Sequence, residues 1–181
     1  HVLVVGGGNI GLEKANAMLE NCPDATITVV ALDFLPGLEA LTHQYPNITL
    51  VQKSFSCGDL LGKDLVIAAT NDKSFNYLVW EKAKGSKVLI NVADTPDLCD
   101  FYLGSIVRKG NLKIAISTNG KSPTIAKRLK EVLQEAIPDT LDGVLTKLSQ
   151  IRDKLKGDFA SKVSKLNSIT EVLVKSEKIE D

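Results

Sequence analysis

The feature that most constrains the fold of this chain is a glycine-rich turn placed directly after an apolar run. The run is Val2–Val5, and the letters GGGNIG follow it. Three glycines occupy the positions of the dinucleotide-binding fingerprint: Gly6 for a tight turn, Gly8 for close approach to a pyrophosphate, and Gly11 for packing of a helix on the strand. The helical pattern from Asn9 to about Leu19 would aim free N–H groups at the phosphates. The alternative is a glycine turn that binds nothing.

An acidic residue follows the second predicted strand. This strand runs from Ala25 to Ala31, and Asp33 comes after its end, about 20 residues beyond the glycine turn. At that spacing a carboxylate binds the adenosine ribose. The acid favours NAD over NADP, because it would repel a 2′-phosphate and no arginine follows to receive one. The alternative is that Asp33 caps a helix that starts near Pro36.

Strands and helices continue to alternate up to residue 94. The predicted elements are a short helix over Leu38–Tyr45, strands over Ile48–Val51 and Asp64–Ala69, a helix over Ser74–Lys84, and an apolar run over Val88–Ile90. Such alternation predicts an α/β fold, a Rossmann-like doubly wound parallel sheet.

Polar residues follow the last two of these strands. Thr70 and Asn71 are placed to contact the adenosine half of a dinucleotide. Together with Asp72, they could equally form the cap of the next helix, and both roles can hold together. The letters NVAD close the fifth strand at Asp94, just before Thr95 and Pro96. Ligands bind beyond the carboxyl ends of parallel strands, so Asp94 is a candidate for chemistry at the lip of the crevice.

The pattern changes after Asp94. Two β-like runs, Phe101–Val107 and Leu112–Ser117, are joined by the turn sequence Arg108–Asn111 and predict a hairpin. Ser122 is then placed to cap a helix that starts at Pro123 and runs to about Ala136. The glycine-containing loop that leads into this helix indicates an anion site at the helix N-terminus. Three basic residues would strengthen anion binding there: Lys121, Lys127 and Arg128. An ordinary capped basic helix is the alternative.

The remainder, from Pro138 onward, is polar with apolar residues at helical spacing. It predicts two or three helices with breaks near Gly157 and Asn167.

Charge is distributed unevenly along the chain. Residues 1–103 carry 7 basic and 12 acidic side chains, and residues 104–181 carry 15 and 10. The basic second half suits an anionic ligand, although a lysine-rich helical tail is often only a solvated surface.

Three cysteines, far apart and odd in number, fit free thiols in a reducing cytoplasm: Cys22, Cys57 and Cys99. They form no metal motif, and no metal site is predicted. No stretch approaches the roughly 20 apolar residues that span a membrane, and no signal peptide is visible. We therefore expect neither a membrane nor nucleic acid as a partner, and cytoplasmic localisation. The chain starts at His1 inside a strand pattern, so the natural protein is expected to begin earlier.

Five segments in this order resemble the precorrin-2 dehydrogenase/sirohydrochlorin ferrochelatase family, which also forms the N-terminal half of many sirohaem synthases. They read GGGNIGLEKA, ITVVALD, LVIAATNDKSFN, INVADTPDLCDF and IAISTNGKSPTIAKRLKE. The resemblance covers about residues 1–137. Many dinucleotide-binding domains share the glycines, but NVADTP followed by a hairpin and ISTNGKSP is far narrower.

The resemblance implies NAD-dependent dehydrogenation of precorrin-2 to sirohydrochlorin and, in bifunctional members, insertion of Fe²⁺. It places the essential aspartate at Asp94 and cofactor contacts at the glycine turn with Asn9 and Ile10, and at Leu32 and Asp33. It also implies a homodimer formed through the segment after the Rossmann domain. The predicted division is an NAD-binding domain (1–97), a hairpin–helix dimerisation segment (98–136) and a C-terminal helical domain (137–181).

A tetrapyrrole substrate carries many carboxylates and needs cations. The predicted cluster is Arg108, Lys109, Lys121, Lys127 and Arg128, with the hydroxyls of Thr118 and Ser122 in the same loop and helix start. Thr118 stands where some family members carry a phosphorylated serine. Two other functions stay open: a ligand-sensing regulatory Rossmann domain that binds NAD without turnover, and a dehydrogenase of another small substrate.

Overall fold

The computed structural model describes residues 1–173; the last part of the predicted C-terminal helical domain, residues 174–181, lies outside the described residues. The chain forms two compact units. One comprises residues 1–105 and 117–126, and the other comprises residues 106–116 and 127–181. The threefold division expected from the sequence concerns roles in binding and assembly, and it stays a prediction.

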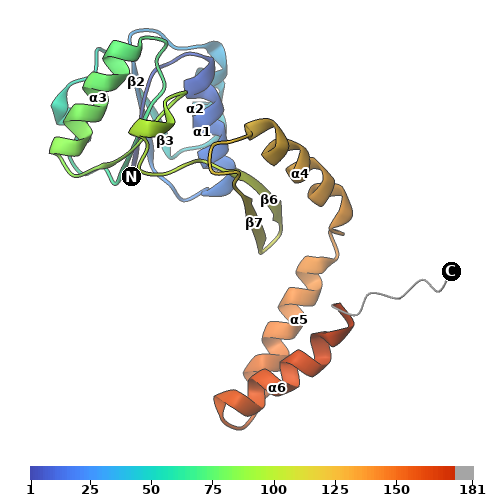
Figure 1. Cartoon of the computed structure of the whole chain (residues 1–181). Helices are drawn as coiled ribbons and strands as arrows, with labels where there is room; N and C mark the ends of the chain where they lie inside the picture. The colour runs from blue at the N-terminus through green and yellow to red at the C-terminus, as the bar shows by residue number, and fades with distance from the viewer. Residues whose placement is uncertain (174–181) are drawn as a thin grey trace. The chain divides into compact units, whose positions relative to one another are not determined.

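The first unit, which contains the blue and green part of the chain in Figure 1, is built on a five-stranded parallel sheet with the strand order β3-β2-β1-β4-β5. Its strands are β1 (Val2–Val5), β2 (Ile27–Ala31), β3 (Ile48–Gln52), β4 (Leu65–Ala68) and β5 (Leu89–Val92). The predicted doubly wound sheet is confirmed. The order reverses between β2 and β4, which both pair with β1. Ligands of such sheets bind beyond the carboxyl ends of the strands at this reversal.

Both faces of the sheet are covered by helices. α1 (Asn9–Asn21) and α2 (Pro36–Gln44) pack on one face, and α3 (Lys73–Gly85) packs on the other with the short 3-10 helix η1 (Cys57–Leu60). Side chains of β1 alternate between the two cores, yet all four are buried. This double coverage explains why the strands read as continuous apolar runs and not as alternating ones.

The free edge of β5 is covered by the segment that follows Asp94. After the 3-10 helix η2 (Pro96–Leu98), the Asp100 N–H donates to the Ile90 carbonyl at 2.8 Å, and the Ile90 N–H donates to the Asp100 carboxylate at 3.1 Å. Lys84 of α3 donates to the other carboxylate oxygen at 2.6 Å. Asp100 thus satisfies backbone groups that an edge strand would otherwise expose.

The predicted hairpin is confirmed, with shifted ends: β6 (Ser105–Lys109) and β7 (Leu112–Ile116) form a two-stranded sheet. The expected start at Phe101 is wrong, because the buried Asn91 side chain holds the Phe101 carbonyl at 2.8 Å beside β5. The turn is shorter than the predicted Arg108–Asn111 and consists of Gly110 and Asn111. Gly110 is in the left-handed region (φ 56°). α4 (Pro123–Ala136) follows with the predicted bounds.

The second unit includes α5 (Leu141–Lys154), α6 (Phe159–Thr170) and the 3-10 helix η3 (Glu171–Leu173). The predicted break near Gly157 is confirmed, and Asp158 caps α6 by accepting from the Ser161 N–H at 2.9 Å. The break predicted near Asn167 is wrong. Asparagine costs a helix only a few tenths of a kcal/mol, roughly, so α6 continues through it to Thr170. In the part of the chain that the structure describes, no helix is long and apolar enough to cross a membrane.

The contacts of Asp100 predict how stability depends on pH. Its ion pair with Lys84 and its bond from the Ile90 N–H lower the pKa of its carboxyl below the ordinary value. The stabilisation is therefore complete above the unfolded pKa of about 3.9 and is lost as the pH falls through the lower folded pKa. In urea unfolding, Asp100→Asn should be less stable than the wild type at pH 7, and the two should converge near pH 2. An equal difference at both pH values would contradict this role.

Candidate functional site

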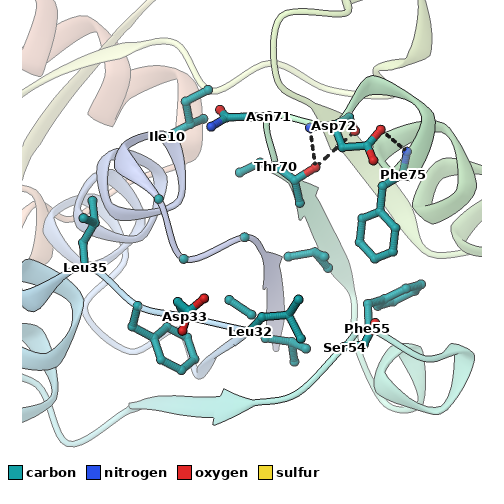
Figure 2. Close-up of a pocket in the computed structure, with 18 of the residues that line it drawn as sticks. Ile10, Leu32, Asp33, Leu35, Ser54, Phe55, Thr70, Asn71, Asp72 and Phe75 are labelled. Carbon is teal, nitrogen blue, oxygen red and sulfur yellow. Dashed lines mark hydrogen bonds between the residues drawn. The ribbon is translucent and has the colours of Figure 1, made fainter.

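A cavity of about 710 Å³ opens at the carboxyl ends of the strands in the first unit (Figure 2). It is lined by the glycine turn after β1 and by the residues that end β2, β3 and β4, together with Phe75 of α3. The cavity therefore lies where the strand order reverses. Its size is within the range of about 300–1,000 Å³ usual for small-molecule sites.

The glycine turn is shaped by close contacts on one side and open space on the other. Gly6 has a φ of 126°, and a Cβ there would lie 2.5 Å from the Ala69 carbonyl oxygen. A Cβ on Gly11 would collide with the Gly6 carbonyl. Gly8 has nothing within 4 Å of its Cβ position. Two glycines thus serve packing, and the third leaves the backbone open to a ligand.

The N-terminus of α1 faces this opening without a side-chain cap among the described residues. Gly8 is its N-cap, and no acidic residue lies in the first turn. The N–H groups of the first turn, from Asn9 onward, are accordingly left for solvent or for an anion. Asn9 and Ile10, both predicted contacts, line the cavity.

Asp33 lines the cavity, and its exposed carboxylate has no hydrogen-bond or ion-pair partner within residues 1–173. The N-cap of α2 is Leu35, so the alternative that Asp33 caps this helix is wrong. Leu32, beside it, is 66% exposed. An unpartnered carboxylate next to an exposed apolar side chain suits a ribose with its attached base.

Thr70 and Asn71 also line the cavity, but the hydroxyl of Thr70 is engaged within the protein. It donates to Oδ1 of the buried Asn76 at 2.7 Å and accepts from the Asp72 N–H at 3.2 Å. Asp72 caps α3 by accepting from the Phe75 N–H at 3.0 Å. The capping role expected for this segment is confirmed, whereas contact of Thr70 and Asn71 with a ligand stays a prediction.

Several residues that line the cavity were not predicted from the sequence. Gly7 lies against β2, where a Cβ would collide with the Asp33 carbonyl. Lys53, Ser54 and Phe55 follow β3, and the Phe55 ring meets Phe75 edge to face, with centroids 6.4 Å apart. The rule that ligands lie beyond strand ends would have identified residues 53–55. Phe75 is brought in only by the packing of α3.

Asp94 lies outside the cavity lining, at the same edge of the sheet. It is exposed, in the left-handed region (φ 55°), and without a side-chain hydrogen bond in the described residues. The N–H of its neighbour Ala93 donates to the Ala68 carbonyl at 2.9 Å, beside Ala69 of the lining.

The turn that carries Asp94 is anchored by Cys99. Its sulfur accepts from the Val92 N–H at 3.2 Å and lies 3.4 Å from the Thr95 carbonyl, to which an S–H can donate. Burial raises the pKa of the Cys99 thiol, which keeps this proton in place. These contacts hold the backbone on both sides of Asp94.

The residues predicted to bind the substrate, five basic side chains and two hydroxyls, are divided between the two units. Thr118, Lys121 and Ser122 belong to the first, and Arg108, Lys109, Lys127 and Arg128 belong to the second. Their grouping around one ligand stays a prediction. Lys109 pairs with Asp139 at 2.6 Å and Arg128 with Glu131 at 2.7 Å.

The loop before α4 has the geometry that its sequence predicts. The Ser122 hydroxyl accepts from the Ile125 N–H at 3.2 Å, which confirms the predicted cap. The Thr118 hydroxyl accepts from the Ser122 N–H at 3.0 Å. Among the described residues no group of three or more histidine, cysteine or acidic side chains could hold a metal ion, and all three cysteines are free thiols.

Comparison with known proteins finds two family patterns in this order along the chain. Residues 1–105 match the family described as putative NAD(P)-binding, and residues 109–136 match the central segment of sirohaem biosynthesis proteins. The first match covers the whole cavity, and the second covers most of the hairpin and α4.

Curated relatives are sirohaem synthases. One from Aeromonas hydrophila is 36% identical over 160 residues, which is 88% of this chain and 34% of the relative. One from Pseudoalteromonas translucida is 38% identical over 158 residues, 87% of this chain and 33% of the relative. The chain thus spans about a third of the length of these relatives. Among solved structures, SirC, a precorrin-2 dehydrogenase, is 29% identical with a TM-score of 0.71, covering 93% of this chain and 83% of that one.

The free carboxylate of Asp33 predicts a binding defect without a folding defect. Asp33→Ala should leave the free energy of unfolding within about 0.5 kcal/mol, because the side chain has no partner to lose. It should weaken NAD binding roughly tenfold, since charge-assisted bonds to the ribose hydroxyls are lost. Isothermal titration calorimetry and urea unfolding measure the two quantities. Asp97→Ala, an exposed acid outside the cavity, is the control, and unchanged NAD affinity in Asp33→Ala would place the ribose elsewhere.

Proposed function

The chain belongs to the family described as putative NAD(P)-binding, and from this premise we propose that it is a precorrin-2 dehydrogenase of sirohaem biosynthesis that uses NAD. The observation that carries the proposal is the order of two patterns in one chain. An NAD(P)-binding pattern is followed directly by a sirohaem-specific one, and the fold resembles that of SirC, a precorrin-2 dehydrogenase, with a TM-score of 0.71.

The cavity fits a dinucleotide. The open side of Gly8 and the uncapped N-terminus of α1 would receive the pyrophosphate, and Asp33 would bind the adenosine ribose. Leu32 and the pair of Phe55 and Phe75 offer apolar surface to the adenine. When bound, NAD supplies the acceptor for a hydride.

Asp94 is the proposed catalytic residue. Dehydrogenation removes a hydride and a proton from the reduced tetrapyrrole, so a base or a negative charge must lie near the departing proton. The exposed Asp94 carboxylate is a proton acceptor without an internal partner in the described residues, and the Cys99 contacts fix its backbone. It follows β5, and its neighbour Ala93 is bonded to the end of β4, which is next to the cavity lining.

The carboxylates of the substrate need cations, which we assign to Arg108, Lys109, Lys121, Lys127 and Arg128. Thr118 and Ser122 belong to the same proposed substrate-binding set. The excess of basic residues after residue 103 supports this assignment.

Fe²⁺ insertion into sirohydrochlorin is a second proposed activity, because sirohaem is the product that the sirohaem synthase relatives are named for. Here Fe²⁺ is a substrate. A carboxylate such as Asp94 can bind Fe²⁺ and can also accept pyrrole protons. A regulatory NAD-binding domain without catalysis is not favoured, because it gives no reason for the sirohaem-specific segment at residues 109–136.

We propose a homodimer as the working assembly. An apolar stripe on α4 is open to solvent in the single chain: Ile125 is 53%, Leu129 45% and Val132 60% exposed. Their spacing places them on one helix face, and such a face is usually covered by a partner. We also place the protein in the cytoplasm, since its three cysteines are free thiols.

Replacing Asp94 tests the proposed chemistry. Asparagine tolerates the left-handed backbone of this position, so Asp94→Asn removes the charge with little strain. We expect kcat to fall roughly 10²- to 10⁴-fold, with NAD affinity within about twofold of the wild type. An anaerobic absorbance assay with precorrin-2 and NAD follows NADH and sirohydrochlorin, and later addition of Fe²⁺ or Co²⁺ follows insertion. Asp97→Asn is the matched control; full activity of Asp94→Asn would remove Asp94 from the mechanism.

The α4 stripe predicts the result of a mass measurement. Size-exclusion chromatography with light scattering should give twice the chain mass at micromolar concentration. Leu129→Lys should shift the protein toward the monomer, because it places a charge in the apolar stripe. Gln134→Lys, an exposed position of the same helix outside the stripe, serves as the control. A wild-type monomer would contradict the proposed dimer.

A further inference from the structure

The cavity contains one basic side chain, Lys53, among the described residues that line it. We propose that Asp59, by holding the Lys53 ammonium, sets the preference of the cavity for NAD over NADP. The inference depends on the proposed function only in treating the cavity as a dinucleotide site. It assigns a specificity role to two residues that lie outside the dinucleotide fingerprint.

Lys53 and Asp33 follow neighbouring strands. β2 and β3 pair in parallel with Ala31 opposite Gln52, so Lys53 comes directly after β3 beside the end of β2. Its N–H donates to the Ala31 carbonyl at 2.9 Å, and the Gln52 side chain donates to the Leu32 carbonyl at 2.9 Å. These bonds hold the two strand ends side by side, so the backbone of Lys53 lies next to the segment that carries Asp33, and both residues line the cavity.

The Lys53 ammonium is held by Asp59 of η1. Its Nζ lies 2.6 Å from Oδ1 of Asp59. Oδ2 of the same carboxylate accepts from the Ser56 N–H at 2.8 Å and from the Ser56 hydroxyl at 3.1 Å. The Asp59 side chain is only 14% exposed, whereas that of Lys53 is 42% exposed. A fixed acid therefore holds a lysine that would otherwise be free to reach a ligand.

Asp59 is charged under ordinary conditions. Burial raises the pKa of its carboxyl. The bond from Lys53 and the two bonds from Ser56 lower this pKa by more than burial raises it, so the net shift is downward. The Asp59 carboxylate therefore compensates the positive charge of Lys53 inside the protein.

This compensation has a consequence for the adenosine 2′ position. A 2′-phosphate carries nearly two negative charges and would meet Asp33 there, with no uncompensated cation in the described lining to balance it. A 2′-hydroxyl has no such cost and can donate to Asp33. Without the Asp59 charge, Lys53 could bind a 2′-phosphate, aided by the hydroxyl of the neighbouring Ser54. Asp33 selects the hydroxyl, and Asp59 withholds the cation that a phosphate needs.

The test is Asp59→Asn in the full chain, with dissociation constants measured by calorimetry for NAD, NADP, 5′-AMP and adenosine 2′,5′-bisphosphate. Asparagine keeps an oxygen that accepts from the Ser56 N–H, so η1 is expected to stay folded, as circular dichroism will verify. We expect the affinity for NADP and for the bisphosphate to rise roughly five- to tenfold. Affinity for NAD and 5′-AMP should stay within about twofold of the wild type.

Two further variants separate Lys53 from a general charge effect. Lys53→Gln in the Asp59→Asn background should remove the gain. Lys53→Gln alone should change NADP affinity less than about twofold, because its charge is already compensated. Asp24→Asn, an exposed acid of the turn before β2, controls for the loss of one surface charge.

The outcomes are distinct. An unchanged ratio of NADP to NAD affinity in folded Asp59→Asn overturns the inference, as does a gain that persists without Lys53. If Asp59→Asn does not fold, a large loss of NADP affinity in Lys53→Gln alone overturns it, because Lys53 would then already be available. Failure of the wild type to bind either nucleotide overturns it together with its premise. A shifted ratio without precorrin-2 turnover supports the inference and contradicts the proposed function.

Discussion

The close approach of the glycine turn to its neighbouring strands is the constraint on which the site depends. Gly6 lies against the carbonyl after β4, Gly7 lies against the segment after β2, and Gly11 lies against Gly6 itself. Any side chain at these points would push the turn away from the sheet. Because the turn is held in place, α1 starts at the reversal of strand order, and the ends of β2, β3 and β4 surround one cavity.

The two acidic residues discussed at this cavity, Asp33 and Asp59, differ in whether the protein itself supplies a partner for the carboxylate. Asp33, which has no partner in the described chain, is proposed to bind the ligand itself, whereas Asp59 is bound to Lys53 and Ser56 and is proposed to act through Lys53. The same distinction holds at the far edge of the sheet. Asp94 is left exposed, whereas Asp100 is engaged by Lys84 and the backbone of β5. In each pair one acid is proposed for chemistry or recognition and the other stabilises the surrounding structure.

Much of the fold could be predicted because its signals are local. The glycine turn, the apolar runs of the parallel strands, the Asp72 and Ser122 caps and the hairpin all follow from neighbouring residues, and the structure confirms them. One error arose where a distant residue intervenes, and another arose where the local signal is weak. Phe101 was expected in a strand, but Asn91 binds its carbonyl; a break was expected at Asn167, but α6 continues through it.

The sequence by itself determined the class of fold, the position of the dinucleotide fingerprint and the resemblance to sirohaem enzymes, because each depends on residue type and spacing along the chain. Only the tertiary structure decided which acids are free and which are paired. Lys53 and Asp59, Thr70 and Asn76, and Val92 and Cys99 are separated by six or seven positions, and each pair meets through a turn whose path depends on packing against the sheet. Spacing fixes which elements form, whereas the partners of a polar side chain depend on how those elements pack.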